Sequence, residues 1–428
     1  MSVIRSLIPQ LPRRAWTVLA GDACSAFGSG LVLPFLIVYL RDVRRISVDT
    51  AGLIVATVAM VSLAAGPAAG WLVDRVGSRR ALLTSLVLSA LGAVAIAGIH
   101  SVPQAFAASA LFGLGMVFLW PASHSLLMSV VTPAQRSSVL SVHYATLNAG
   151  LGIGGVFGGL VADVGNPRSF ELLYLIDALT FVAFAGLLFK LRDIGGPVEP
   201  DEALEDGRGG YRQVLSDRVF LRLCALGALL VAVGYAQLES GYPAFATGQG
   251  GIGTRTLGFT FAVNTSVIVI GQLVILKKLA GVRRTRALAV MCVLWASAWL
   301  ITLAAGNASV GWFATAGFMV AMGVFALGET FMSPTLPAMV NDLAPESLRG
   351  RYNGAYSMSW SVGHMIGPAV AGFALEHRSG NSLFAALVVA CGIAGIVALR
   401  LERHLPPRAN LVGGDITGAP PPLDPIVP

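Results

Sequence analysis

Charged residues are scarce in this sequence of 428 residues, of which only 12% are Asp, Glu, Lys or Arg. Soluble domains contain about 25% charged residues, and this chain combines its deficit with 55% apolar residues and a mean hydropathy of +0.74. A water-soluble protein cannot bury so much apolar surface. The scarcity of charge therefore excludes a soluble enzyme and indicates a membrane protein with several spans.

Cysteines and enzyme motifs are also few. The four cysteines, Cys24, Cys224, Cys292 and Cys391, lie inside apolar runs without CxxC spacing, so we expect neither a disulfide nor a metal site. The sequence contains no GxxxxGK[ST], HExxH or GxSxG pattern, each of which would carry a specific chemistry. We expect no ATP-driven transport, no enzyme activity and no cofactor.

The net charge of +7 is not arranged as a nucleic-acid surface. Basic residues occur in short clusters between apolar runs, without a basic stripe that alternates with aromatic residues, so we expect no nucleic-acid partner. They fit the role of topology determinants better. With the N-terminus placed in the cytoplasm, 23 of the 29 Lys and Arg residues fall on the cytoplasmic side. The exceptions include Arg41, Arg44 and Arg45 in the first outer loop.

Twelve apolar segments are long enough to cross a bilayer, which takes about 20 residues per helix. They lie at 16–40, 50–73, 81–99, 104–131, 139–162, 172–189, 219–247, 257–276, 287–305, 310–341, 353–375 and 382–399. We therefore expect an all-α membrane protein with an N-terminal six-helix bundle (1–189), a cytoplasmic linker (190–218), a C-terminal six-helix bundle (219–405) and a disordered cytoplasmic tail (406–428).

The two sets of six helices repeat at a constant shift of 213 residues. This shift superimposes Leu114-Gly115 on Leu327-Gly328 and Pro121 on Pro334. It also superimposes the glycines of the fifth segment on those of the eleventh. Because a constant offset across several segments is hard to obtain by chance, the sequence predicts two parallel pseudo-symmetric bundles, with a substrate site between them near the middle of the bilayer.

The loop after the second segment carries the most specific motif. Residues 70–80 read GWLVDRVGSRR, which resembles the GxLxDRxGRR signature of the major facilitator superfamily. The resemblance implies a twelve-helix transporter in which this loop latches the bundles, with the Asp74 carboxylate against the positive end of a helix. The latch residues implied are Gly70, Asp74, Arg75, Gly77, Arg79 and Arg80. A basic loop that only sets topology is the alternative.

The corresponding loop of the second half departs from this pattern. The segment 277–284 reads KKLAGVRR, which keeps a glycine and basic residues but has lysine where the acid belongs. A latch in the second half is therefore in doubt.

The fifth and eleventh segments carry glycine patterns. The eleventh, GHMIGPAVAG at 363–372, is similar to the GxxxGPxxGG pattern of antiporters, whereas the fifth has Gly155 where that pattern has proline. Antiporter function and ordinary close helix packing explain these residues equally well. The residues concerned are Gly150, Gly154, Gly155, Gly159, Gly363, Gly367, Pro368 and Gly372.

Four acids lie within apolar segments: Asp22, Asp177, Glu239 and Glu329. An acid at the bilayer centre costs about 2.5–3.5 kcal/mol, so it faces a wet space or a partner. No Lys or Arg lies mid-span, and an acid without a basic partner can exchange its proton for a cationic ligand. Glu329 resembles the acidic residue in the tenth helix of drug:proton antiporters and is the first candidate, followed by Asp22 and Glu239.

Asp177 ranks lowest of the four acids. His124, His143 and His364 can shuttle protons or bond a neighbouring helix, and the latter is the commoner role. The resemblance to the drug:proton antiporter branch implies proton-coupled export of lipophilic or cationic small molecules by a monomer in the plasma membrane. A lipid or lysolipid flippase and an uptake symporter are the alternatives within transport, and a non-transporting membrane sensor is the alternative outside it.

Overall fold

The computed structural model describes residues 11–132, 135–191, 194–196, 207–279, 281–332, 334–345 and 348–411. These residues form helices and connecting turns without a β-strand. The first half contains α2 (Arg13–Val32), α3 (Leu36–Val38), α4 (Val48–Val76), α5 (Ser78–Ala97), α6 (Val102–Ser129), α7 (Arg136–Val161) and α8 (Pro167–Leu188). A short helix, α9 (Gly207–Ser216), precedes the second half.

The second half repeats this order. It contains α10 (Arg218–Val233), α11 (Tyr235–Glu239), α12 (Gly241–Gly248), α13 (Thr254–Leu279), α14 (Arg284–Gly306), α15 (Gly311–Glu329), α16 (Leu336–Leu343), α17 (Arg349–Glu376), α18 (Gly380–Leu401) and α19 (Pro407–Asn410). Ten of the described helical stretches are long and apolar enough to cross a membrane, and α13 and α17 complete the twelve predicted segments. The prediction of an all-helical membrane fold is confirmed.

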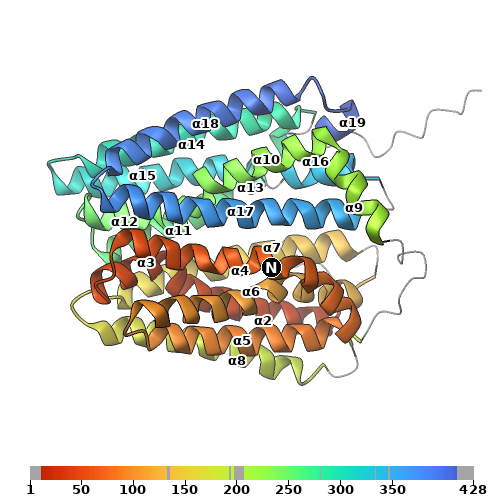
Figure 1. Ribbon diagram of the computed structural model, residues 1–428, viewed down its shortest axis with the longest axis horizontal. Helices are drawn as coiled ribbons and strands as arrows, with labels where there is room; N and C mark the ends of the chain where they lie inside the picture. Colours follow the sequence, from red (N-terminus) through yellow and green to blue (C-terminus); the bar gives the residue numbers. More distant parts are fainter. Residues whose placement is uncertain are drawn as a thin grey trace, which may run out of the picture.

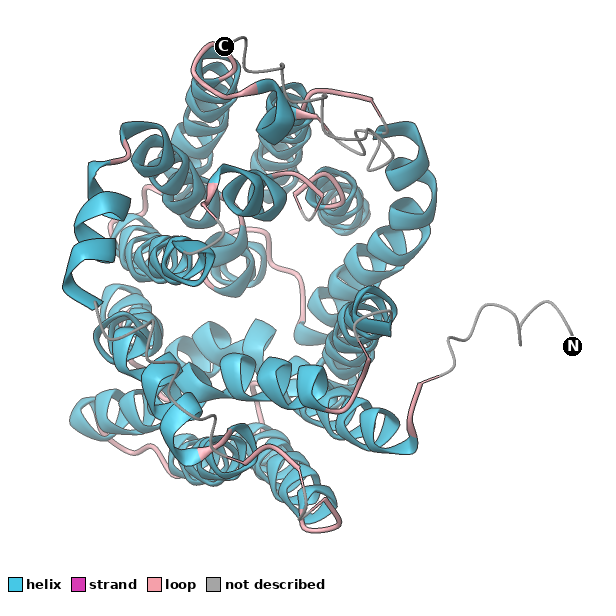
Figure 2. Cartoon of the chain, turned by 90° about the vertical axis from the view of Figure 1, so that its right-hand side faces the viewer, coloured by secondary structure: helices cyan, strands magenta, loops and turns pink. Residues whose placement is uncertain are grey.

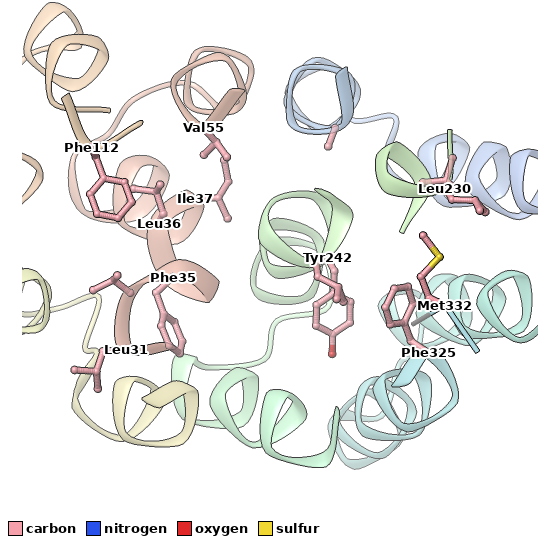
Figure 3. Packing of buried hydrophobic residues seen from close by; sticks show 14 of the residues in the cluster. Leu31, Phe35, Leu36, Ile37, Val55, Phe112, Leu230, Tyr242, Phe325 and Met332 are labelled. Atoms are coloured by element: carbon pink, nitrogen blue, oxygen red, sulfur yellow. The ribbon is translucent and has the colours of Figure 1, made fainter. Parts of the chain in front are cut away.

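The two halves lie side by side with their long helices roughly parallel. Figure 1 shows α2 to α8 as one group and α10 to α18 as the other, and Figure 2 shows the same helices end-on. We call the end of the molecule that holds α9, α16 and α19 the termini face, and the opposite end, with α3 and α12, the distal face. In both halves the interior is filled by apolar side chains, among them Phe35 in the first half and Phe325 beside Met332 in the second (Figure 3).

Three of the twelve predicted helices are not continuous, which corrects the sequence-based expectation. The first breaks at a 3-10 turn, Leu33–Phe35, around Pro34, which has no N–H to donate. The seventh is divided at Gly234 and Ser240, where the backbone leaves helical geometry. The tenth ends at Glu329 and resumes only at Leu336.

The linker and the tail also differ from expectation where they are described. Residues 207–216 of the predicted linker form α9, and Val214 is fully buried. Residues 407–410 of the predicted disordered tail form α19, in which Asn410 is buried and accepts a hydrogen bond at 3.0 Å from the amide of Thr285. The capping of α14 by this side chain explains why the start of the tail is ordered. Residues 412–428 lie outside the described part of the chain.

The halves touch most closely near the distal face. The α4 and α17 helices are in contact there, because a Cβ at Gly52 would lie 2.3 Å from the carbonyl oxygen of Pro368. Further along the same two helices, toward the termini face, a Cβ at Gly66 or at Gly354 would have no neighbour within 4 Å. The two helices therefore separate toward the termini face.

Candidate functional site

Asp22 belongs to a buried cluster in the first half. Its carboxylate accepts a hydrogen bond from the Ser123 hydroxyl of α6 at 2.7 Å, and the Nε2 atom of His143 on α7 lies 3.2 Å from Asp22 Oδ2. Asp22 is 3% exposed and His143 is 2% exposed. A carboxylate and an imidazole held together in this way form a unit that can hold and release a proton.

The indole of Trp120 covers this cluster. The rings of Trp120 and His143 stack with their centroids 5.2 Å apart and their planes inclined by 21°. Unlike the two residues beneath it, Trp120 is 56% exposed. His124, one turn further along α6, lies near His143 as well.

Glu329 is buried at the end of α15, and 8% of the residue is exposed. It adjoins the side chains of Asn264 on α13 and Tyr235 on α11. Even so, its Oε2 atom and the Nδ2 atom of Asn264 have no hydrogen-bond partner. A buried carboxyl with an unused oxygen is available for a proton or for a ligand donor.

Consecutive residues of α7 link the two clusters. His143 contacts Asp22 in the first half, whereas Tyr144 lies near Glu329 of the second half. The 213-residue repeat extends to this site, because it superimposes Asp22 on Tyr235 and His143 on Tyr356. Tyr235 and Tyr356 also lie near one another. The first half therefore presents an acid–imidazole pair where the second half presents two tyrosines beside Glu329.

Glu239 makes a looser contact with a histidine. Its Oε1 atom lies 3.9 Å from Nε2 of His364 on α17, and the Glu239 side chain is 40% exposed. The Nδ1 atom of His364 lies 3.1 Å from the carbonyl oxygen of Trp360. The Glu239–His364 contact joins the seventh and eleventh helices, as the Asp22–His143 contact joins the first and fifth.

Asp177 stands apart from these residues. It is fully buried on α8 next to Gly28 of α2, and neither carboxylate oxygen has a hydrogen-bond partner. It therefore faces the interior of the first half. Among the described residues, no three His, Cys, Asp or Glu side chains gather in a way that could hold a metal ion.

The predicted latch loop forms a tight turn between α4 and α5. Gly77 has φ +89° and ψ 141°, a conformation that only glycine adopts readily. Arg79 donates from Nε to the carbonyl oxygen of Leu188 at 3.1 Å. Arg75 and Arg80 are exposed, and Arg75 has a partner. The side chain of Asp74 and the surroundings of Gly70 lie outside the described residues, so the contact expected for Asp74 stays a prediction.

The second-half loop obtains acids from elsewhere in the chain. Arg283 and Arg286 both pair with Glu402, which directly follows α18. Arg284 pairs with Asp342 of α16 at 2.5 Å. Glu402 and Asp342, which sequence reasoning missed, therefore supply the negative charge that the local motif lacks. No signal within the loop itself identifies them.

The glycines of α7 and α17 fall on two faces of each helix. Gly150 and Gly154 contact α2, and Gly363 and Gly367 contact α10 and α11, so these four pack within one half. Gly155 and Gly159 contact α13, and Gly372 contacts α4, so these three pack between the halves. Pro368 lies inside α17, next to Gly52 of α4.

Sequence reasoning considered Asp22 and His143 separately, and it missed Ser123 and Trp120. One feature of the sequence could have predicted that Asp22 and His143 lie close together. His143 precedes Gly150 by seven residues, or two helical turns, so it lies on the face of α7 whose glycines pack against α2. No comparable signal identifies Trp120, because its neighbour is fixed by the crossing of three helices.

Comparison with known proteins agrees with this architecture. A family model described as Major Facilitator Superfamily matches residues 18–326 and 281–425. Similar proteins include Multidrug resistance protein 1 of Bacillus subtilis, 23% identical over 91% of this chain and 97% of its own length. A Na(+), Li(+), K(+)/H(+) antiporter of Planococcus maritimus is 28% identical over 79% of this chain and 84% of its own length.

Solved structures share the fold at low sequence identity. A peptide transporter POT, solved in complex with sulfate, has a TM-score of 0.72 at 16% identity and covers 92% of this chain and 96% of its own. A bacterial homologue of the human lysosomal transporter Spinster, solved in an inward-facing and unoccupied conformation, has a TM-score of 0.71 at 13% identity and covers 92% and 97%.

Proposed function

The chain belongs to the Major Facilitator Superfamily, and on this basis we propose that it is a proton-coupled exporter of lipophilic or cationic small molecules. It works in the plasma membrane as a monomer, with both termini in the cytoplasm. The termini face is then the cytoplasmic face, and the proton gradient drives release of the substrate at the distal face.

The observation that carries the proposal is the pair of buried acids on the two sides of the interface between the halves. Asp22, with His143, belongs to the first half, and Glu329 belongs to the second. Tyr144, which follows His143 in α7, lies near Glu329. A cationic ligand that binds between the halves lies near a carboxyl group of each half and can take the place of a proton. Glu239, beside His364, is the third candidate for proton or substrate binding.

Alternating access follows from how the halves touch. Contacts at the distal face and separation of α4 from α17 toward the termini face fit a state that is open to the cytoplasm. Residues 1–189 and 219–405 rock as two bodies about the glycine contacts between them. The latch residues around Gly77 hold the halves together when the cytoplasmic side closes.

The test is substrate-dependent proton movement in proteoliposomes with an imposed pH gradient. Ethidium and tetraphenylphosphonium are the cationic probes. We expect both to dissipate the gradient with the wild-type protein, and we expect the isosteric variants Glu329→Gln and Asp22→Asn to abolish this effect.

Asp177→Asn is the matched control, because it makes the same change at an equally buried acid that lies away from the interface. It should retain proton movement. If neither cation moves protons with the wild-type protein, the proposal is wrong. If Glu329→Gln behaves like the wild type, the assignment of that residue fails.

A further inference from the structure

Trp120 has two different faces. One face of its indole stacks on His143, whose other contact is the Asp22 carboxylate. The residue is nevertheless 56% exposed, so the opposite face of the ring is uncovered.

Neighbouring contacts locate Trp120 on one side of α2. A Cβ at Gly21 would lie 1.9 Å from the Phe184 ring of α8, so α8 covers one side of α2. The adjacent Asp22 is turned instead to Ser123 and His143. Trp120 reaches from α6 to α7 on this second side of α2. Because α7, which carries His143, also contacts α13 of the second half, we infer that this side of α2 and the uncovered face of Trp120 are directed to the space between the halves.

We propose that the free face of Trp120 binds an aromatic or alkylated organic cation, and that His143 on the covered face accepts a proton only when that cation leaves. The inference rests on the proposed export function and states how proton binding and substrate binding are coupled at its site. Indole is the aromatic side chain that binds cations best. Here the protonated His143 imidazole on one face of the ring competes with the cationic ligand on the other.

The ligand and the protonated His143 compete because they lie close enough to repel each other. A cation binds an indole within about 6 Å of the ring centroid, which places it ~11 Å from His143, since the two rings are 5.2 Å apart. Two like charges at that separation, in a medium of effective dielectric constant about 20, weaken binding about tenfold. One proton gained by the His143 imidazole therefore replaces one positive charge on the ligand, and the net charge of the site is unchanged.

Other titratable groups lie near His143. Asp22 on α2 and His124 on α6 are titratable side chains that lie near His143. Tyr144, the next residue of α7, lies near Glu329 of the second half. The uncharged form of His143 leaves Asp22 as the negative charge that attracts the ligand. Protonation of His143 neutralises that charge.

The test measures ethidium binding to the purified full-length protein in nanodiscs, by fluorescence anisotropy from pH 5.5 to pH 8. We expect wild-type affinity to fall about tenfold toward the acidic end. His143→Gln should bind ethidium with no such pH dependence. Phenanthridine, which has the same ring system without the permanent charge, should bind with no dependence on His143.

Trp120→Leu should weaken ethidium binding about tenfold, because the free energy of a desolvated cation–π contact is of that order. Trp120→Phe should retain part of the affinity for ethidium. Trp312→Leu is the matched control, because Trp312 is 66% exposed but lies at the start of α15, next to the distal face. Because Trp120→Phe keeps an aromatic ring at this position, it still tests the role of Trp120 if Trp120→Leu fails to fold.

The outcomes separate the two proposals. If ethidium drives protons in liposomes but Trp120→Leu binds it as tightly as the wild type, the role of Trp120 is wrong and export stands. If His143→Gln keeps the wild-type pH dependence, the coupling through His143 is wrong. If the wild-type protein neither binds ethidium nor moves protons, both proposals fail.

Discussion

Gly159 of α7 and Gly372 of α17 occupy equivalent positions in the two halves, and each meets a helix of the opposite half. A Cβ at Gly159 would lie 2.7 Å from the Cα of Gly258 on α13, and one at Gly372 would lie 2.6 Å from the carbonyl oxygen of Val48 on α4. Real Cβ atoms do not approach so closely. The two glycines therefore fix how near the halves come at the distal face.

Gly159→Val and Gly372→Val should each push the halves apart at the distal face. The measurement is the rate at which a membrane-impermeant maleimide labels Thr254→Cys, a distal residue whose hydroxyl donates to the carbonyl oxygen of Ala162 in the other half. We expect faster labelling in a background without native cysteines. Gly186→Val is the control, because a Cβ at Gly186 has no neighbour within 4 Å. Unchanged labelling in both glycine variants would contradict the packing argument.

The second prediction concerns a charged contact between the halves. Arg41 donates from Nη1 to the carbonyl oxygen of Ala244 at 2.6 Å and from Nη2 to the hydroxyl of Thr247 at 2.8 Å. Arg41→Gln removes this fork of donors, which glutamine cannot replace. We expect spin labels at Arg168 and Ser309, on the distal faces of the two halves, to show a larger population of long distances.

Arg45→Gln is the matched control for Arg41, since Arg45 is exposed and close in sequence. It should leave the distance distribution unchanged. A distribution for Arg41→Gln that matches the wild type means that the glycine contacts alone close the distal face.

The same arginines show what sequence patterns could and could not predict. The excess of basic residues on one side was expected, and Arg41 and Arg44 were exceptions. The structure explains them by specific contacts, since Arg44 donates to the Tyr39 hydroxyl and pairs with Glu171. Such contacts depend on which helices are neighbours, and hydropathy carries no information on that.

The internal repeat of 213 residues predicted more of the helix packing than the individual motifs did. The shift of 213 residues predicted equivalent glycines, and Gly154 and Gly367 do pack α7 and α17 against equivalent helices. Hydropathy could not reveal the break after Glu329, because residues on both sides of it are apolar. The Asp22–His143 pair depends on the angle at which α7 crosses α2, so neither residue alone predicted the other.

The third prediction tests the turn of the latch loop. Gly77 has φ +89°, where a side chain is strained, so Gly77→Ala should lower the free energy of unfolding by about 1–2 kcal/mol. Gly98→Ala is the control, because Gly98 has φ −91° and its nearest neighbour to a Cβ is 3.8 Å away. Thermal unfolding in detergent compares the two, and equal melting temperatures would contradict the prediction.

The last prediction concerns pH at the termini face. Glu402 follows α18, and hydrogen bonds from Arg286 and Arg283 lower the pKa of its carboxyl below the ordinary value. Because the folded pKa is lowered, this carboxylate stabilises the fold above its ordinary pKa of about 4.3. The stabilisation is lost as the pH falls through the lowered value.

Glu402→Gln should therefore lower the melting temperature by about 1 °C at pH 7, since partly exposed ion pairs contribute ~0.2–1 kcal/mol. At pH 3 the wild type and the variant should converge. Because salt screens exposed charges, 1 M NaCl at pH 7 should also narrow the difference. A difference that persists undiminished at pH 3 would mean that Glu402 acts through packing or through its hydrogen bond with Thr285, and that its charge does not hold the C-terminal segment against α14.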